Sequence, residues 1–111
     1  WALCCILICA SNVHILKLMK YEWDSRKAVE NIRKHGIEFT DAVIALEDEN
    51  ALTIEDIDHN EQRFKTLGMG ALLNILFVVH LERGKNNIRV ISARKADKKE
   101  IKQYYKGLNY E

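Results

Sequence analysis

The sequence predicts an α+β domain in which helices cover an antiparallel sheet of about four strands. Two segments with helical spacing of apolar residues come early in the chain, and a third closes it. Between them lie short segments that alternate apolar and polar residues or are apolar throughout, as strands do. The predicted order is a strand, two helices, a meander of three or four strands and a C-terminal helix, which is typical of this fold class.

The first strand is predicted over residues 20–23, and the first helix over residues 25–35. Asp24 can cap this helix, because its carboxylate can accept a hydrogen bond from a free amide in the first turn. Gly36 follows the helix, where a left-handed residue commonly ends it. A second short helix is predicted over residues 39–46.

The remaining strands are predicted over residues 52–57, 63–69, 72–81 and 87–94. The third of these is apolar at almost every position, which indicates a central strand covered on both faces. Residues 82–87 contain a glycine and two asparagines and suit a hairpin turn.

The last helix is predicted to open at Asp97, with Glu100 three residues later as in a capping box. Apolar and aromatic residues at helical spacing are expected on its buried face: Ile101, Tyr104, Tyr105 and Leu108.

Residues 19–111 form the predicted domain, and residues 1–18 an N-terminal extension outside the fold. The extension is either unstructured or read in from outside the gene, and the alternative is an extra strand through residues 13–17. Its apolar stretch of ten residues is too short to span a membrane. All three cysteines lie in the first nine residues, which argues against a disulfide framework and for a reducing, cytoplasmic compartment.

Charge is distributed unevenly along a chain whose net charge is only +1. Residues 38–62 hold nine acids and no Lys or Arg, whereas residues 83–106 hold nine Lys or Arg against two acids. A concentrated basic segment suits phosphate binding. A chain of 111 residues has too small a core for a deep pocket, so we expect an open surface groove that fits a polymeric substrate.

Residues throughout the domain resemble the BrnT family of toxins, whose fold is RelE-like. The resemblance covers about residues 19–106, although Ser25 stands where family members often have proline. It is carried by Tyr21-Glu22-Trp23-Asp24, Lys27, Asn31, Lys34-His35-Gly36, Phe39, Ala42, His59, Glu61, Arg63, Gly68, the segments 79–84 and 88–96, Glu100 and Tyr104.

The resemblance implies a ribonuclease that arrests translation and is neutralised by an antitoxin, BrnA, which itself binds the operator DNA. It thus implies an antitoxin and an RNA substrate as partners, operator DNA only through the antitoxin, and no membrane. The alternative is a non-catalytic module that binds RNA or protein on the same fold.

Cleavage of RNA without a metal or other cofactor requires a base for the 2′-hydroxyl and cations for the phosphate. Arginine suits the phosphate, because its planar fork binds two oxygens and keeps its charge. His59, Glu61 and Arg63 offer a base and a cation within a few residues. Lys27, on the first helix, is a further catalytic candidate and a third possible base.

In a regular strand, Arg89 and Arg94 would point to opposite faces of the sheet. Only one of them could then enter a groove unless a bulge intervenes, and we expect Arg94 to be the catalytic cation. Arg89, Lys95 and the turn residue Arg83 are candidates for binding the nucleic acid. His80 is expected to be a core residue, because it alternates with apolar neighbours in a buried strand.

Overall fold

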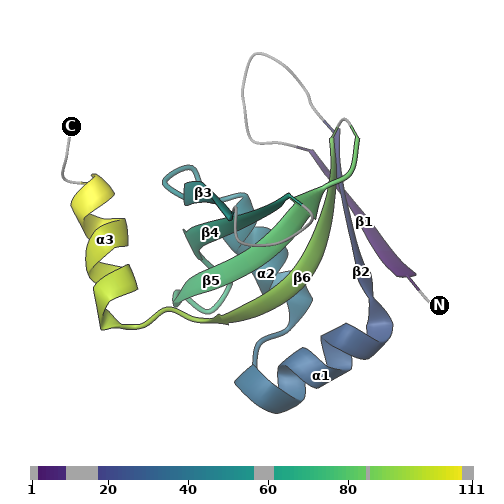
Figure 1. Ribbon diagram of the computed structural model, residues 1–111, viewed down its shortest axis with the longest axis horizontal. Coiled ribbons are helices and arrows are strands. Elements are labelled where there is room, and N and C mark those ends of the chain that lie inside the picture. Colours follow the sequence, from purple (N-terminus) through teal and green to yellow (C-terminus); the bar gives the residue numbers. More distant parts are fainter. Residues whose placement is uncertain (1–2, 10–17, 57–61, 85, 109–111) are drawn as a thin grey trace.

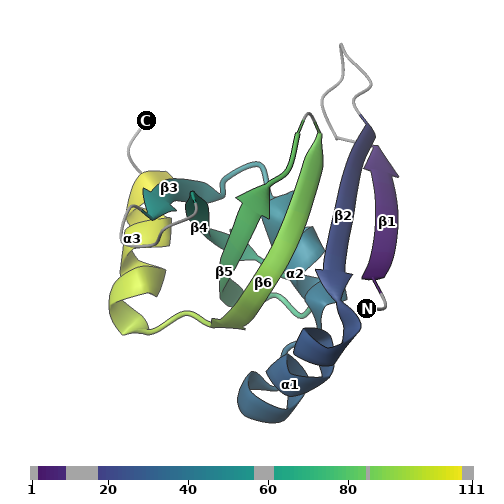
Figure 2. The same cartoon turned by 45° about the vertical axis from the view of Figure 1, so that its right-hand side comes forward.

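The computed structural model describes residues 3–9, 18–56, 62–84 and 86–108 of the chain. The strands form one sheet in the order β1-β2-β6-β5-β4-β3. Figures 1 and 2 show α3 at the β3–β4 side of this sheet, far from β1. The elements are β1 (Leu3–Cys9), β2 (Leu18–Asp24), α1 (Ser25–His35), α2 (Phe39–Leu46), β3 (Leu52–Asp56), β4 (Arg63–Met69), β5 (Ile75–Glu82), β6 (Asn87–Lys95) and α3 (Lys98–Leu108).

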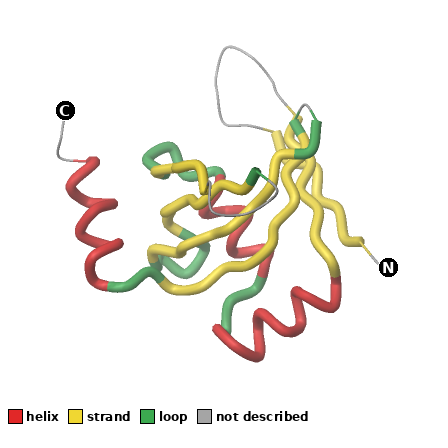
Figure 3. The backbone as a smooth tube through the Cα atoms, in the orientation of Figure 1, coloured by secondary structure: helices red, strands yellow, loops and turns green. Residues whose placement is uncertain are grey.

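The α+β class is confirmed, but the sheet of the described residues has six strands and is mixed, whereas about four antiparallel strands were predicted. The neighbouring strands β2 and β6 run parallel, with Lys20 opposite Asn87 and Glu22 opposite Arg89. Every other neighbouring pair in the described sheet is antiparallel. Parallel pairing needs a long connection, and the helices and strands between β2 and β6 supply it (Figure 3).

The edge strand β1 pairs antiparallel with β2, from Leu3 opposite Asp24 to Cys9 opposite Leu18. This differs from the expectation that residues 1–18 lie outside the fold. Pairing satisfies the backbone groups along the outer side of β2, which would otherwise form an open sheet edge. The alternative strand through residues 13–17 lies outside the described residues.

Helix α1 has the predicted bounds and the predicted caps. The carboxylate of Asp24 accepts a hydrogen bond of 2.9 Å from the amide of Arg26. Gly36 ends the helix with a φ of 71°, a left-handed conformation that other residues rarely adopt. The apolar stripe on this helix does not face the core, because Val29 and Ile32 are 59% and 47% exposed.

Asn31 is the buried residue of α1 that faces the sheet. Its Nδ2 donates to the carbonyl oxygens of Ala93 and Ile37 at 2.8 and 2.9 Å. Its Oδ1 accepts a hydrogen bond of 3.1 Å from the amide of Ala93. The side chain thus bonds to both backbone groups of Ala93 as a neighbouring strand would, and it holds α1 against β6.

Helix α2 packs closely on β4. Its buried residues, Phe39, Ala42, Val43 and Ala45, join the main core with residues of β2, β5 and β6. A Cβ atom at Gly68 of β4 would lie 2.1 Å from the carbonyl oxygen of Ala45. Glycine is therefore required for this approach of helix to strand.

Helix α3 packs on the opposite face of the sheet. Its Tyr104 lies in a second core cluster with Leu67 and Ile75. The predicted capping box is present, because the amide of Glu100 donates to Asp97 at 2.8 Å and Glu100 accepts from the amide of Asp97 at 2.9 Å. The predicted burial of Tyr105 is wrong, since this residue is 43% exposed.

Asp48, just beyond α2, links the helices on the two faces. Its carboxylate accepts hydrogen bonds from the Tyr104 hydroxyl of α3 and, at 2.9 Å, from the amide of Met69 of β4. Burial raises the pKa of Asp48, but the hydrogen bonds from Tyr104, Met69 and Asn50 outweigh it and lower the pKa overall.

The strand predicted over residues 72–81 begins later, at Ile75. Leu72 and Leu73 belong to the turn before it and are 72% and 78% exposed. The hairpin between β5 and β6 agrees with the prediction. None of the helices within the described ranges is long and apolar enough to cross a bilayer.

Candidate functional site

Strand β6 contains a bulge that decides which of its side chains share a face. Val79 of β5 lies opposite Ser92, but the next residue, His80, lies opposite Val90. Ile91 is therefore an extra residue in β6, and alternation between the two faces is shifted there. Val90 and Ala93 consequently both enter the main core, with 1% and 0% exposure.

We call the two sides of the sheet the covered face and the open face. The covered face carries Val78, His80, Val90 and Ala93, which are all buried beneath α1 and α2. The open face carries the alternating residues, among them Leu67, Phe77, Val79 and Ser92. Helix α3 packs on one end of it, around Leu67 and Phe77, and Val79 and Ser92 beyond that end are half-buried.

Strands β4 and β6 contribute four cations to the open face. In β4, Arg63 and Lys65 point to the side opposite the buried Thr66. Lys65 lies opposite Val79 of β5. Arg94 lies opposite Phe77, and Arg89 lies opposite Leu81. The bulge at Ile91 brings Arg89 to the same face as Arg94, so the predicted choice between these two arginines does not arise.

Arg89 and Glu22 form an ion pair between the parallel strands β6 and β2. The guanidinium Nη1 lies 3.5 Å from the Glu22 carboxylate, and the two side chains are 15% and 11% exposed. Water is largely excluded from this pair, so the attraction between the two charges is screened less than it would be in an exposed pair. Arg89 is thus held in a fixed position beside the exposed part of the sheet.

A second group of charges lies at the junction of β3 and β4. The buried carboxylate of Asp56 is 3.8 Å from the ammonium group of Lys65, and Asp56 lies opposite Arg63. Among the described residues of the open face here, two cations thus neighbour one acid. Such a local excess is what an anionic phosphate requires.

The guanidinium group of Arg94 has two partners, the carboxylate of Glu100 and the ring of Phe77. Its Nη1 and Nη2 donate to the two carboxylate oxygens of Glu100 at 2.9 Å each, and its Cζ lies 4.2 Å from the centre of the Phe77 ring. The hydrogen bonds raise the pKa of Arg94 and lower the pKa of Glu100. Arg94 thereby fastens the start of α3 to β6.

The structure does not place the other predicted site residues on the open face. Lys27 is exposed on α1, one helical turn before Asn31. Arg83 is exposed, and its amide donates to Asn87 at 2.8 Å within the predicted turn. Lys95 alternates with Arg94 and so points away from the open face. His59 and Glu61 lie outside the described residues, and their predicted roles stay predictions.

His80 is buried on the covered face, as predicted for a core residue. Its Nε2 lies 2.8 Å from the Thr66 hydroxyl, and its ring stacks on Phe64 with centroids 5.8 Å apart. Burial lowers the pKa of His80 to about 4, because a charged imidazole would lose its hydration there. His80 is therefore neutral at physiological pH.

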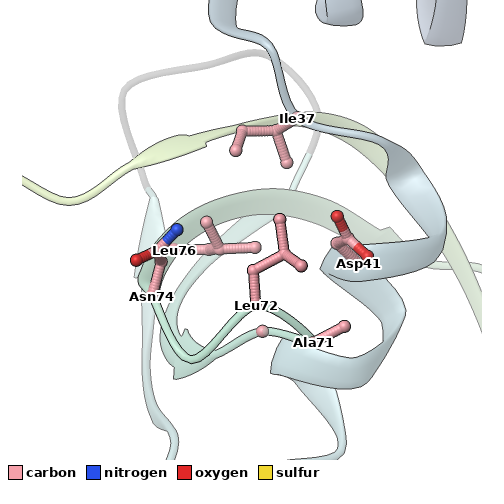
Figure 4. Close-up of a pocket in the computed structure, with 7 residues that line it drawn as sticks. Ile37, Asp41, Ala71, Leu72, Asn74 and Leu76 are labelled. Atoms are coloured by element: carbon pink, nitrogen blue, oxygen red, sulfur yellow. The ribbon is translucent and has the colours of Figure 1, made fainter.

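A small cavity lies between the turn before β5 and the start of α2 (Figure 4). Ile37, Leu72 and Leu76 form most of its apolar wall. Its volume of about 10 Å³ is only enough for a single water molecule. This cavity is too small to serve as a substrate site.

Sequence reasoning missed Lys65, Asp56 and Glu22. Lys65 could have been found, because it stands two residues after Arg63 in a strand and so shares its face. Glu22 and Asp56 carry no comparable signal, since their partners come from other strands. The bulge at Ile91 has none either, because the segment reads as a regular strand.

Two comparisons with known proteins agree with each other. Residues 23–100 match the family model described as the ribonuclease toxin, BrnT, of type II toxin-antitoxin systems. The crystal structure of the Brucella abortus ribonuclease toxin BrnT is similar to this chain, with a TM-score of 0.55 and 29% sequence identity. The match covers 68% of this chain and 94% of that one. No curated protein matches the sequence.

Proposed function

The chain belongs to the BrnT family of ribonuclease toxins of type II toxin-antitoxin systems, and on this premise we propose that it cleaves RNA on the open face without a metal ion. The observation that carries the proposal is the gathering of Arg63, Lys65 and Arg89 on one face. Cations positioned in advance stabilise a phosphate whose charge grows during the reaction.

The proposed reaction is attack by a ribose 2′-hydroxyl on the adjacent phosphate. The proton of that hydroxyl passes to a base, a new bond forms between its oxygen and phosphorus, and the bond to the 5′-oxygen breaks. The products are a 2′,3′-cyclic phosphate and a 5′-hydroxyl, which takes its proton from an acid. Every atom transferred comes from RNA, protein side chains or water.

Each group has a role in this scheme. Arg63 binds the scissile phosphate beside Lys65, and Arg89, held by Glu22, stabilises the developing charge. His59 or Glu61 serves as the base, since Glu61 is two residues from Arg63 in the sequence, whereas Lys27 is exposed on α1, the helix that packs on the covered face. Arg94 positions α3 through the carboxylate of Glu100.

The partner in this proposal is a BrnA-type antitoxin, which covers the toxin and binds operator DNA on its behalf. The proposed compartment is the cytoplasm, where messenger RNA is translated. Co-expression with the product of an adjacent antitoxin gene should restore growth to cells that produce this chain. Growth arrest that persists with every neighbouring gene product would contradict this part of the proposal.

The decisive experiment uses the purified chain and end-labelled RNA in buffer containing EDTA. We expect cleavage to continue and to leave 2′,3′-cyclic phosphate ends, while RNA with 2′-deoxy substitutions stays intact. Cleavage that stops with EDTA would contradict the absence of a metal, and cleavage of the 2′-deoxy RNA would contradict the nucleophile. Tight binding of RNA without any cleavage would indicate the non-catalytic alternative.

A further inference from the structure

A cleft of about 310 Å³ lies on the open face, between strands β3 to β6 and helix α3. Leu67 and Phe77 form its apolar floor, while Ile54, Lys65 and Gln103 are among the residues of its rim. Its volume is at the lower end of the ~300–1,000 Å³ that is usual for pockets that bind small groups. The cleft is thus large enough for one flat, partly polar ring.

The cleft lies next to the charges that take part in the proposed reaction. Lys65 lines the cleft and also pairs with Asp56 at 3.8 Å, within the group of charges assigned above to the scissile phosphate. A ring in the cleft would therefore be attached to a backbone whose phosphate lies beside Lys65. In RNA, the group that is flat, partly polar and attached beside a phosphate is the base.

The walls of the cleft have the chemistry that recognises an unpaired base. Phe77 and the Arg94 guanidinium stacked on it form a flat platform, and RNA-binding proteins stack bases on such aromatic and guanidinium planes. Ile54 is 61% exposed on β3, and this apolar side chain would be covered by a base. Gln103 is exposed on α3 and offers both a donor and an acceptor.

We propose that this cleft is a base-recognition subsite that takes one unpaired purine of the RNA substrate, and guanine above adenine. Guanine presents two acceptors, N7 and O6, on one edge, and the Lys65 ammonium can donate to both. The subsite rests on the proposed function, since it names the base next to the cleaved phosphate. It would give the nuclease a sequence preference that the phosphate-binding cations cannot supply.

Binding of a substrate that cannot be cleaved tests the subsite separately from catalysis. The probe is a labelled short 2′-O-methyl oligouridine with guanine, adenine, cytosine or an abasic residue at one central position, and fluorescence anisotropy measures its affinity for the full chain. We expect guanine to bind best and the abasic probe to bind about tenfold more weakly, because it loses the stacking contribution.

The variants Ile54→Ala and Gln103→Ala should each reduce the difference in affinity between the guanine and abasic probes. Both side chains are exposed, so the fold should survive their truncation. Ile44→Ala is the matched control, because Ile44 is 47% exposed on α2 and lies at the covered face. It should keep the preference of the parent chain.

Equal affinity for the guanine and abasic probes would overturn the subsite, and so would a preference for cytosine or a difference between those two probes that neither substitution reduces. These outcomes leave the cleavage assay in EDTA unaffected. Conversely, a chain that distinguishes the probes but leaves normal RNA intact would support the subsite and contradict the nuclease proposal.

Discussion

Arg89 and Arg94 lie on the same face of the sheet although five positions separate them in β6. The extra residue Ile91 produces this arrangement by shifting the alternation of side chains. A regular strand would have sent one of the two guanidinium groups beneath the helices, where Val90 and Ala93 now lie.

Arg89 should contribute strongly to RNA cleavage. We expect Arg89→Ala to lower the cleavage rate by roughly 100-fold, the size of effect seen when one preorganised charge-stabilising group is removed. Arg33→Ala is the control, since Arg33 is an exposed arginine of α1. A variant that cleaves as fast as the control would contradict the role of Arg89. Thermal unfolding should accompany the assay, because the substitution also leaves Glu22 without this arginine.

Arg94→Ala should affect stability more clearly than it affects catalysis. The substitution removes the bidentate hydrogen bonds to Glu100 and the contact with Phe77. Because the Arg94 side chain is 38% exposed, we expect a loss of only about 1 kcal/mol in unfolding free energy. Its cleavage rate, measured well below the unfolding temperature, should fall less than that of Arg89→Ala. The opposite order would make Arg94 the catalytic cation.

The stability of the protein should fall in mild acid because of His80. Its folded pKa is lowered to about 4 by burial, while the unfolded value is ~6.5. As the pH falls from 6.5 toward 4, the unfolded chain takes up a proton that the folded chain does not. The unfolding free energy therefore decreases, by at most about 3 kcal/mol from this group. Urea denaturation at several pH values measures this dependence.

His80→Gln isolates the contribution of this histidine to the pH dependence. Glutamine can keep a hydrogen bond to Thr66, but it does not titrate. The variant should lose less stability than the parent between pH 6.5 and 4. Parallel curves for the two proteins would show that another group is responsible.

Gly68→Ala should destabilise the fold. Its Cβ would lie 2.1 Å from the Ala45 carbonyl oxygen, so α2 must move away from β4. Overpacking of this kind typically costs about 1–3 kcal/mol. Gly107→Ala is the control, because a Cβ there meets only the flexible Leu52 side chain at 3.3 Å and alanine favours helix. Equal melting temperatures for the two variants would contradict the close approach.

Local signals in the sequence predicted the helices well. The bounds of α1 follow from Asp24 and Gly36, which act through neighbouring backbone groups. The capping box at Asp97 and Glu100 is equally local. The apolar stripe of α1 was misleading, because Asn31 faces the sheet and leaves Val29 and Ile32 exposed.

Pairing between distant strands could not be read from the sequence. The parallel contact of β2 with β6 depends on the path of the chain between them, and it is this contact that joins Glu22 to Arg89. The site was only partly predicted, because its residues also come from strands that are distant in the sequence. Arg63 and Arg94 were identified by residue type and spacing, whereas their neighbours on other strands were not.

The hydrogen bonds between Asn31 and Ala93 have a consequence for the inner strand β6. Its described pairing with β2 runs only from Asn87 to Arg89, so β2 does not pair with Ala93 further along. Asn31 occupies the backbone groups of Ala93 with a side chain, and these buried polar groups stay satisfied. One amide thus allows two parallel strands to part inside the core.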